Sequence, residues 1–405
     1  MSEANFLEKL LDGAEVEWLP LGDVTQYEQP TKYLVKTKNY DDAFETPVLT
    51  AGKTFILGYT DETDGINKAS GNPVIIFDDF TTANKWVDFD FKAKSSAMKI
   101  ITSSDDNKFI LKYVYYWMNT LPSELTDGDH KRHWISNFCN KKIPIPCPDD
   151  PKKSLTIQAE IVRILDAFTE LTAELTAELT AELTARKKQY NHYRDQLLTF
   201  SDDTNVEWKP LDKVAQYSKT RISFEALDET NYVGVDNLLQ NRAGKVDSNY
   251  APTSGNLTQY KVGDILLGNI RPYLKKIWHA DRIGGTNGDV LVIHPTDKNI
   301  NPRYIYQVLA DDKFFEYNMQ HAKGAKMPRG NKLKIMEYNI PIPYANDPQK
   351  SLAEQARIVD ILDKFDALTN SISEGLPREI ELRQKQYEYY RDLLLNFPKP
   401  MEEAA

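Results

Sequence analysis

The sequence predicts a mixed α/β protein in which two globular domains are separated by two long antiparallel helices that form a coiled coil, with an internal pseudo-twofold repeat. Three observations support this class. One long helical pattern crosses the middle of the chain, segments of the first half recur in the second, and short β-rich runs lie between the recurring segments. The predicted parts are a first domain at 1–150, a central helix at 151–200, a second domain at 201–347, a C-terminal helix at 348–397 and a tail at 398–405.

The central helix contains a tetrapeptide, TAEL, written three times at residues 172–183. Strong helix formers dominate and neither Gly nor Pro interrupts residues 154–200, so a continuous helix there would be roughly 70 Å long. Four residues advance ~400° around a helix, so the leucines drift ~40° per repeat and make a poor coiled-coil seam. We therefore expect the tetrads to adjust the length of a spacer. The alternative is slippage in a repetitive gene, tolerated because an exposed helix accepts extra turns.

The recurring segments indicate a duplicated module, each copy being a domain followed by a long helix. VEWLPLGDVTQY at 16–27 returns as VEWKPLDKVAQY at 206–217, and IPIP at 143–146 returns at 340–343. Residues 158–168 and 188–195 match 355–365 and 385–392. The inserts, 28–140 and 218–335, show no sequence similarity that we can align. We expect one scaffold that presents two unlike recognition surfaces, with drift after duplication as the alternative.

Within the inserts, β-rich runs bounded by Gly, Asn, Asp and Pro predict strands, and two apolar segments predict short helices. The strands are expected at 72–77, 96–102, 264–267 and 289–294, and the helices at 113–121 and 303–309. Each insert is therefore expected to be a mixed α/β globule.

The second long helix is expected to begin near Ser351, where Ser351 and Glu354 fit a capping box. The Gly-Leu-Pro sequence at 375–377 is expected to break or kink this helix. Apolar residues recur at helical spacing in both long helices, and we expect the two stripes to bury each other in an antiparallel pair. The stripe residues are Ile161, Ile164, Leu165, Phe168 and Leu171, and their repeats Ile358, Ile361, Leu362, Phe365 and Leu368.

Composition limits the class of protein. The length of 405 residues suggests two or three domains, and no apolar run is long enough for a membrane span. The N-terminus lacks the features of a signal peptide, and Cys139 and Cys147 are too few for a disulfide framework, so we expect a cytoplasmic protein with reduced thiols. The net charge of −10 excludes a uniformly basic surface but not a local basic patch.

Motifs for catalysis are weak. AGKT at 51–54 resembles the end of a phosphate-binding loop, but Pro47 stands where that loop requires glycine, so we interpret it as a turn. The glycine-rich dinucleotide fingerprint and an Asn-Pro-Pro-Tyr motif are both absent, and His130, His133 and Cys139 lack metal-ligand spacing. We expect this chain to catalyse nothing and to bind no metal or cofactor itself.

Basic loops at equivalent places in the two copies indicate nucleic-acid binding. Residues 319–334 hold lysines and arginines among glycines, just before the second IPIP, and a basic stretch follows His130 before the first. A third basic run, NIRPYLKK, occupies 269–276. Lys and Arg contact phosphates and guanine edges, so these loops suit DNA recognition, with solvated loops as the alternative. The predicted DNA contacts are Lys131, Arg132, Trp134, Arg271, Lys275, Lys276, Lys323, Lys326, Arg329 and Lys332.

Together, the repeated segments, the unlike inserts and the NIRPYLKK run resemble the specificity subunit of type I restriction–modification systems. The TAEL tetrads resemble those of the type IC branch, although the first insert lacks the Ile-Arg-Pro-Tyr sequence. The resemblance implies a non-catalytic subunit with two target-recognition domains, each recognising one half of a split double-stranded DNA target. It also implies that the long helices set the gap between the two halves.

The resemblance further implies partner proteins. Two methyltransferase subunits would use S-adenosylmethionine to modify adenine, and motor–nuclease subunits using ATP and Mg²⁺ would complete the complex. Our candidate partner contacts are the aromatic and arginine residues of the repeated helix ends, with packing of the coiled coil as the alternative. These are Tyr190, Tyr193, Arg194, Tyr387, Tyr390 and Arg391. The rival function is a non-catalytic duplicated coiled-coil scaffold whose basic loops bind acidic proteins or RNA.

Overall fold

The computed structural model describes residues 5–50, 54–122, 133–201, 204–370 and 375–398, and it divides into two compact units. Unit 1 comprises Met1–Glu174 and Gln384–Ala405, and unit 2 comprises Leu175–Arg383. Each unit contains one of the predicted domains together with parts of the long helices. Both units mix helices and strands, as the sequence predicts.

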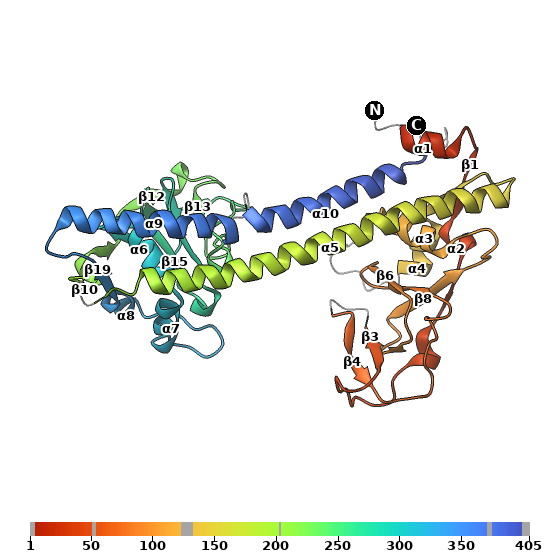
Figure 1. Cartoon of the computed structure of the whole chain (residues 1–405), viewed down its shortest axis with the longest axis horizontal. Coiled ribbons are helices and arrows are strands. Elements are labelled where there is room, and N and C mark those ends of the chain that lie inside the picture. The colour runs from red at the N-terminus through yellow and green to blue at the C-terminus, as the bar shows by residue number, and fades with distance from the viewer. Residues whose placement is uncertain (1–4, 51–53, 123–132, 202–203, 371–374, 399–405) are drawn as a thin grey trace. The chain divides into compact units, whose positions relative to one another are not determined.

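The central helix, α5 (Pro151–Leu197), is continuous over its 47 residues (Figure 1). The C-terminal helical region contains α9 (Pro348–Asn370) and α10 (Gly375–Leu394), and the non-helical backbone of Gly375 confirms the predicted interruption. Gly375 has a φ of +77°, and a Cβ there would lie 2.6 Å from the carbonyl oxygen of Ala367 in the last turns of α9. Only glycine fits this left-handed, crowded position without strain.

The helix starts differ from the predicted capping box. Both α5 and α9 begin with proline, whose fixed φ suits the first helical position. The carboxylates of Asp150 and Asp347 accept hydrogen bonds of 3.0 Å from the backbone N–H of Lys153 and Lys350. The prediction that Ser351 caps α9 is therefore wrong, because the aspartate and proline start the helix earlier and leave this serine inside it.

The described residues of unit 1 form helix α1 (Asn5–Leu11) and three small sheets. A ribbon pairs β1 (Val16–Pro20) with β9 (Lys142–Pro146). An antiparallel sheet has the order β2 (Thr25–Glu28), β8 (Met98–Ser103), β5 (Val74–Asp78), β6 (Asn84–Val87), and a third sheet has the order β4 (Ile56–Thr60), β3 (Thr46–Leu49), β7 (Lys92–Ala93). The remaining helices are α2 (Leu21–Val24), α3 (Leu111–Met118), α4 (His133–Ser136) and the 3₁₀ turns η1 (Pro30–Tyr33) and η2 (Phe138–Asn140).

Unit 2 repeats this plan. Its ribbon pairs β10 (Glu207–Pro210) with β19 (Asn339–Ile342), and its main sheet has the order β11 (Ala215–Tyr217), β18 (Val290–Pro295), β15 (Ile265–Gly268), β16 (Ile277–His279). A further sheet has the order β12 (Arg221–Ser223), β14 (Asn256–Tyr260), β17 (Gly284–Thr286), β13 (Tyr232–Val233). The helices are α6 (Pro302–Leu309), α7 (Asp312–Gln320), α8 (Lys332–Glu337) and the 3₁₀ turns η3 (Leu211–Lys213), η4 (Phe224–Ala226), η5 (Gln240–Arg242) and η6 (Pro272–Leu274).

The inserts share a topology that their sequences do not reveal. In each main sheet, the strand that leads into the insert (β2 or β11) pairs with the last strand of the insert (β8 or β18), and that last strand pairs with a hairpin from the middle of the insert. The predicted strands correspond to β5, β8, β15 and β18, and the predicted short helices to α3 and α6. The expectation of one scaffold is confirmed at the level of fold.

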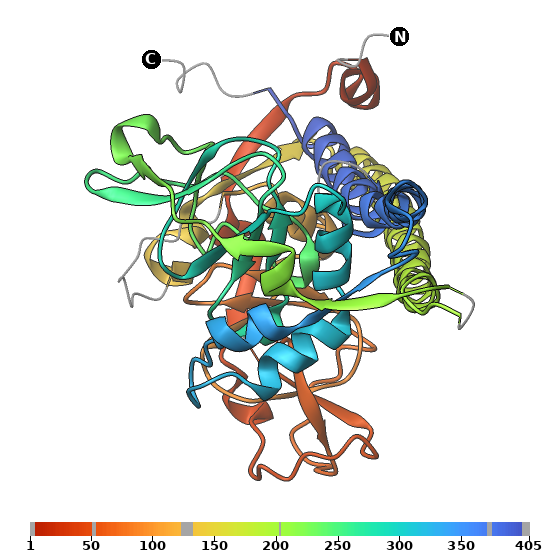
Figure 2. The ribbon, with the colours of Figure 1, turned by 90° about the vertical axis from the view of Figure 1, so that its left-hand side faces the viewer.

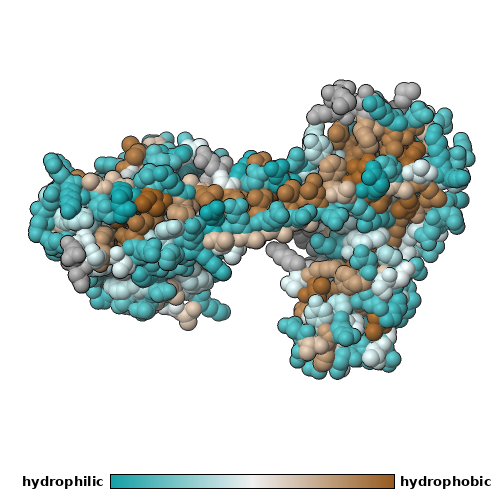
Figure 3. Space-filling model, in the orientation of Figure 1, coloured by the Kyte–Doolittle hydropathy of each residue, from teal (hydrophilic) through white to brown (hydrophobic). Residues whose placement is uncertain are grey.

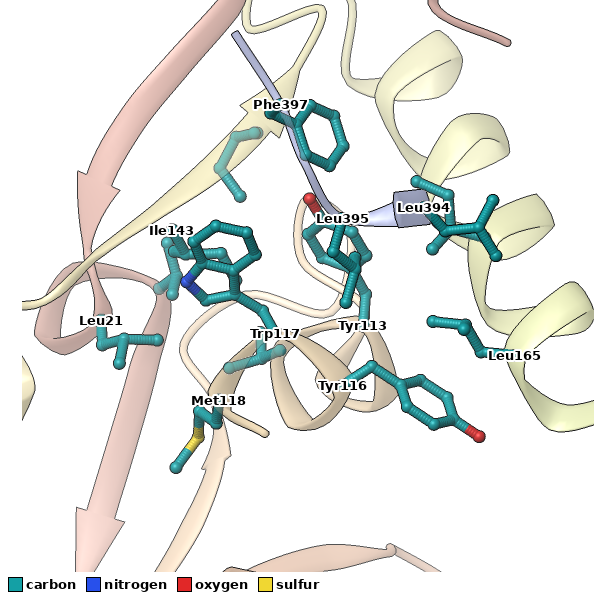
Figure 4. Packing of buried hydrophobic residues seen from close by; sticks show 14 of the residues in the cluster. Leu21, Tyr113, Tyr116, Trp117, Met118, Ile143, Leu165, Leu394, Leu395 and Phe397 are labelled. Carbon is teal, nitrogen blue, oxygen red and sulfur yellow. The ribbon is translucent and has the colours of Figure 1, made fainter. Parts of the chain in front are cut away.

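The long helices run antiparallel in each unit. In unit 1, Phe168 of α5 stacks on Tyr390 at 5.5 Å and the Thr169 hydroxyl donates to the Tyr387 oxygen at 3.2 Å, while Leu165 lies in the core with Leu394 (Figure 4). Residue numbers thus rise along α5 as they fall along α10. In unit 2, α9 lies alongside α5 (Figures 1 and 2) and Tyr193 stacks on Phe365 at 5.3 Å.

The apolar stripes do not bury each other as expected. Ile161 and Leu165 are buried in the core of unit 1, which α3 and the end of α10 complete, and Ile358 and Leu362 are buried in the core of unit 2. Each stripe instead attaches its helix to the domain that precedes it. The visible face of the long helices carries hydrophobic and hydrophilic residues side by side (Figure 3). No helix in the described part of the chain has both the length and the apolar character needed to cross a membrane.

A repeated glutamine holds each domain to its helix. The Gln355 side chain accepts from Asn301 N–H at 2.8 Å and donates to the Ser351 hydroxyl at 3.0 Å, and Gln158 accepts from Ile110 N–H at 2.9 Å and donates to the Ser154 hydroxyl at 3.0 Å. Both glutamines are fully buried. The recurring QAxIV sequence therefore has a structural role, since it fixes the segment that enters α6 or α3.

Gln355→Leu is expected to destabilise unit 2 by about 2 kcal/mol, because it leaves the partly buried Asn301 N–H without its acceptor. Gln384→Leu is the matched control, since Gln384 is exposed and bonds Glu388 at 3.2 Å on the surface of α10; it should change stability by less than about 0.5 kcal/mol. Urea unfolding followed by circular dichroism measures both. Equal midpoints for the two variants would contradict this role of Gln355.

Candidate nucleic-acid interface

In unit 2 the two basic loops predicted from sequence lie against each other. Ile270 and Arg329 form an antiparallel bridge, the backbone N–H of Arg271 donates to Pro328 O at 2.7 Å, and that of Gly330 donates to Asn269 O at 3.1 Å. Lys323 and Arg329 exchange backbone hydrogen bonds of 2.9 and 2.8 Å, which close the second loop on itself. Segments far apart in the chain thus form one backbone-bonded basic surface, which we call the paired-loop surface (residues 269–276 and 321–334).

Close packing fixes the junction of the paired loops. An added Cβ at Gly330 would lie 2.6 Å from the Asn318 side-chain oxygen and 2.8 Å from that of Asn269. Both asparagines are buried. Because no larger residue fits here without displacing buried groups, Gly330 sets how closely the two loops approach.

The predicted cations of the paired-loop surface fall into two groups. Three already have partners: Lys275 Nζ lies 2.8 Å from Asp312, Arg329 Nη1 lies 3.1 Å from Asp289, and Lys276 Nζ donates to Val235 O at 2.7 Å. Burial lowers the pKa of Lys276, which fits a structural role. The side chains without an ion pair in the described residues are exposed and carry the free positive charge: Arg271, Lys323, Lys326 and Lys332.

Exposed apolar side chains lie between these charges. Tyr273 is 49% exposed, Met327 50% and Leu333 77%. Apolar side chains in the major groove contact the thymine methyl group, and cations contact phosphates and guanine edges. The mixture suits DNA better than a purely charged surface would. Sequence analysis did not single out these three residues, although they stand inside the predicted loops.

Unit 1 corrects one predicted DNA contact. Trp134 is only 2% exposed, and its ring packs edge-on against Phe77 at 5.1 Å. Its backbone N–H donates to the Asp79 carboxylate at 3.0 Å, and Asp79 in turn pairs with the buried Lys99 at 3.4 Å. Trp134 is therefore a core residue that anchors the chain immediately after the basic stretch. The predicted contacts Lys131 and Arg132 lie outside the described residues.

The candidate partner contacts also fall into two groups, one buried and one accessible to solvent. Tyr190 and Arg194 are each 2% exposed: Arg194 donates to Ala310 O at 2.8 Å and to Gln307 at 2.9 Å, and also contacts the Tyr190 hydroxyl. These two side chains are inside unit 2, so the packing alternative describes them and the partner-contact prediction is corrected. The remaining candidates are at least partly accessible on the helix surfaces: Tyr193, Tyr387, Tyr390 and Arg391.

The described residues contain no cluster of three His, Cys, Asp or Glu side chains that could hold a metal ion. His133 and Cys139 belong to α4 and η2, whereas His130 lies outside the described residues. What the described geometry offers is a backbone-bonded surface in unit 2 that is positively charged and partly apolar.

Comparison with known proteins identifies the class. The sequence model of one protein family, described as the type I restriction modification DNA specificity domain, matches this chain twice, at residues 14–185 and 206–382. The chain therefore belongs to the family of DNA specificity subunits of type I restriction–modification systems. The two matches correspond to the two copies of the duplicated module.

Relatives support this assignment along the whole chain. The Escherichia coli EcoR124I/EcoR124II specificity subunit is 54% identical over 415 residues, covering 99% of both chains. The Escherichia coli EcoprrI specificity subunit is 32% identical, covering 92% of this chain and 93% of its own. A putative specificity subunit of Haemophilus influenzae is 31% identical, covering 97% and 98%. None of these relatives supports the alternative of a coiled-coil scaffold that binds acidic proteins or RNA.

Solved structures share the fold at low identity. A specificity subunit from M. genitalium matches with a TM-score of 0.50 and 13% identity, covering 96% of this chain and 98% of that chain. A chain from work on complex assembly and conformational transition of the type I system matches with a TM-score of 0.55 and 14% identity, covering 94% and 97%. At such identities, the similarity concerns the fold alone.

Proposed function

We propose that each domain of this specificity subunit recognises one half of a bipartite double-stranded DNA target, and that the long helices set the gap between the halves. The observation that carries the proposal is the paired-loop surface of unit 2, where two loops distant in sequence are bonded together with free cations and exposed apolar side chains. The equivalent surface of unit 1 is proposed at the basic stretch before Trp134. The segments 1–150, 151–200, 201–347, 348–397 and 398–405 are the proposed functional parts.

The chain itself is proposed to be non-catalytic and to act in a cytoplasmic complex. Two adenine methyltransferase subunits using S-adenosylmethionine and motor–nuclease subunits using ATP and Mg²⁺ are the proposed partners. Tyr193, Tyr387, Tyr390 and Arg391 remain candidate contacts with the methyltransferases, since they are at least partly accessible. We also place the chain in the type IC branch, which the TAEL tetrads support.

The net charge of −10 suggests that partners supply part of the positive surface around the DNA. The isolated chain should therefore bind DNA weakly, and its affinity should fall steeply with salt because phosphate contacts release counterions. Tight, sequence-specific binding by the purified chain alone would contradict this division of roles.

The proposal is tested by mapping N6-methyladenine in cells that express the chain with its candidate methyltransferase partner. A split motif with two defined halves and an undefined gap is expected, and it should disappear when the chain is omitted. Methylation by a verified active partner that is independent of this chain would overturn the proposal.

A further inference from the structure

Two neighbouring turns of unit 2 hold an unusual backbone conformation. Asn241, Arg242, Arg271 and Lys275 all have positive φ values, of 55°, 66°, 53° and 52°. Side chains disfavour this left-handed conformation, which persists where surrounding contacts impose it and which occurs often at functional sites. The backbone N–H of Arg242 donates to Lys275 O at 2.9 Å and joins the two turns. One of these two strained turns, the one that holds Arg271 and Lys275, therefore belongs to the first of the two paired loops.

Side-chain contacts account for the imposed conformation. One carboxylate oxygen of Asp312 lies 2.6 Å from Arg242 Nη1 and 2.8 Å from Lys275 Nζ. Arg242 Nη1 also donates to Ala310 O at 2.8 Å. Burial of Asp312 favours its neutral form, but Lys275 and Arg242 outweigh burial and lower its pKa. An ionised Asp312 thus holds two cations from two different turns.

The same contacts lead to the long helix. Arg194 of α5 donates through Nη1 to Ala310 O at 2.8 Å, so two guanidinium groups share one carbonyl. Ala310 caps the C-terminus of α6, where the helix dipole places partial negative charge. A continuous chain of charge-assisted hydrogen bonds therefore runs from Arg194 through Ala310, Arg242 and Asp312 to Lys275.

We propose that Arg242 and Asp312 are positioning residues that lock the paired-loop surface to α5, so that the complex accepts a single gap length. This inference rests on the proposed function of the helices and loops. One base pair changes the separation of the half-sites by ~3.4 Å and their relative rotation by ~35°. A complex can reject such a change only if the recognising loop cannot shift or turn by that amount relative to its helix. The chain of contacts supplies this stiffness.

The test uses the full chain with its methyltransferase partner and a set of DNA targets whose gap is one pair shorter, correct or one pair longer. Asp312→Asn is expected to raise methylation of the wrong gaps relative to the correct gap by about tenfold, the effect of losing one charge-assisted interaction, with the half-site bases unchanged. Arg242→Lys, which keeps the charge but loses the two-partner geometry, should move selectivity in the same direction. Asp312→Glu keeps the carboxylate, so it should retain most of the selectivity for the correct gap.

Lys313→Ala is the matched control. Lys313 is adjacent in sequence and also reaches α5, through a 2.8 Å ion pair with Asp195, but both side chains are exposed. Its loss should leave gap selectivity unchanged, because exposed ion pairs contribute little. Three results would overturn the inference. They are unchanged gap selectivity in both Asp312→Asn and Arg242→Lys, whatever their overall rate, altered half-site bases in either variant, or an equal effect of Lys313→Ala. If the unmodified chain directs methylation to no split motif in DNA, the proposed function itself is refuted.

Discussion

Deleting residues 180–183 is expected to shorten the undefined gap of the DNA target by one base pair and to leave both half-sites unchanged. One tetrad contributes ~6 Å and ~40° of rotation. One base pair contributes ~3.4 Å and ~35°. Length alone favours nearly two pairs, but the rotation favours one, and a recognition surface must stay in phase with its groove. A map of N6-methyladenine with and without the deletion measures the change.

The structure makes this deletion tolerable. None of the side chains at 172–183 is buried, and the Thr180 hydroxyl donates within its own helix, to Thr176 O at 2.7 Å. Removing one tetrad therefore opens no core in either unit. Leu179→Ala, which keeps the helix length, is the control and should leave the gap unchanged. An unchanged gap after deletion would show that the helix does not set the gap, while the role in DNA recognition would stand. An altered half-site would show that gap length and half-site recognition are not independent.

Arg271→Ala is expected to reduce methylation by about 5- to 150-fold and to relax base preference in only one half-site, because a specific arginine–guanine contact contributes ~1–3 kcal/mol. Arg271 is the exposed, left-handed residue at the junction of the paired loops, and its charge is not neutralised by an ion pair in the described residues. Methylation rates on targets substituted at each half-site position measure the effect.

Arg282→Ala provides the comparison, since Arg282 is an exposed arginine of the same unit that pairs with Asp281 at 2.6 Å outside the paired loops. It should leave rate and base preference unchanged. If Arg271→Ala weakens binding equally for all sequences and lowers its salt dependence, Arg271 contacts phosphate instead of a base. If both arginine variants behave alike, the paired-loop surface is not the DNA interface.

The organisation of the molecule follows from local sequence. Helix propensity and the absence of Gly and Pro predict α5 over nearly its full length, and Gly375 predicts the interruption of the second helical region. Repetition of VEW, IPIP and QAxIV predicts two copies of one scaffold. These features depend on residues close together in the chain, and period and composition record them directly.

Tertiary structure decided which predicted residues face outward. Arg194 and Trp134 are residue types that often contact partners or DNA, yet both are buried because they bind groups distant in the chain. Arg194 donates a hydrogen bond to Ala310 O, whereas Trp134 packs against Phe77 and donates its backbone N–H to Asp79. Whether a lysine or arginine of the basic loops keeps its free charge likewise depends on carboxylates elsewhere in the chain, Asp289 and Asp312.

The sequence by itself therefore determined the repeat, the long helices and the position of the basic loops. Only the tertiary structure decided that the loops at 269–276 and 321–334 form one surface, that each apolar stripe packs in the core of its own unit, and that the inserts share a topology. The physical reason is range. Propensity and periodicity act over a few residues, whereas pairing of loops and neutralisation of charges depend on groups that only folding brings together.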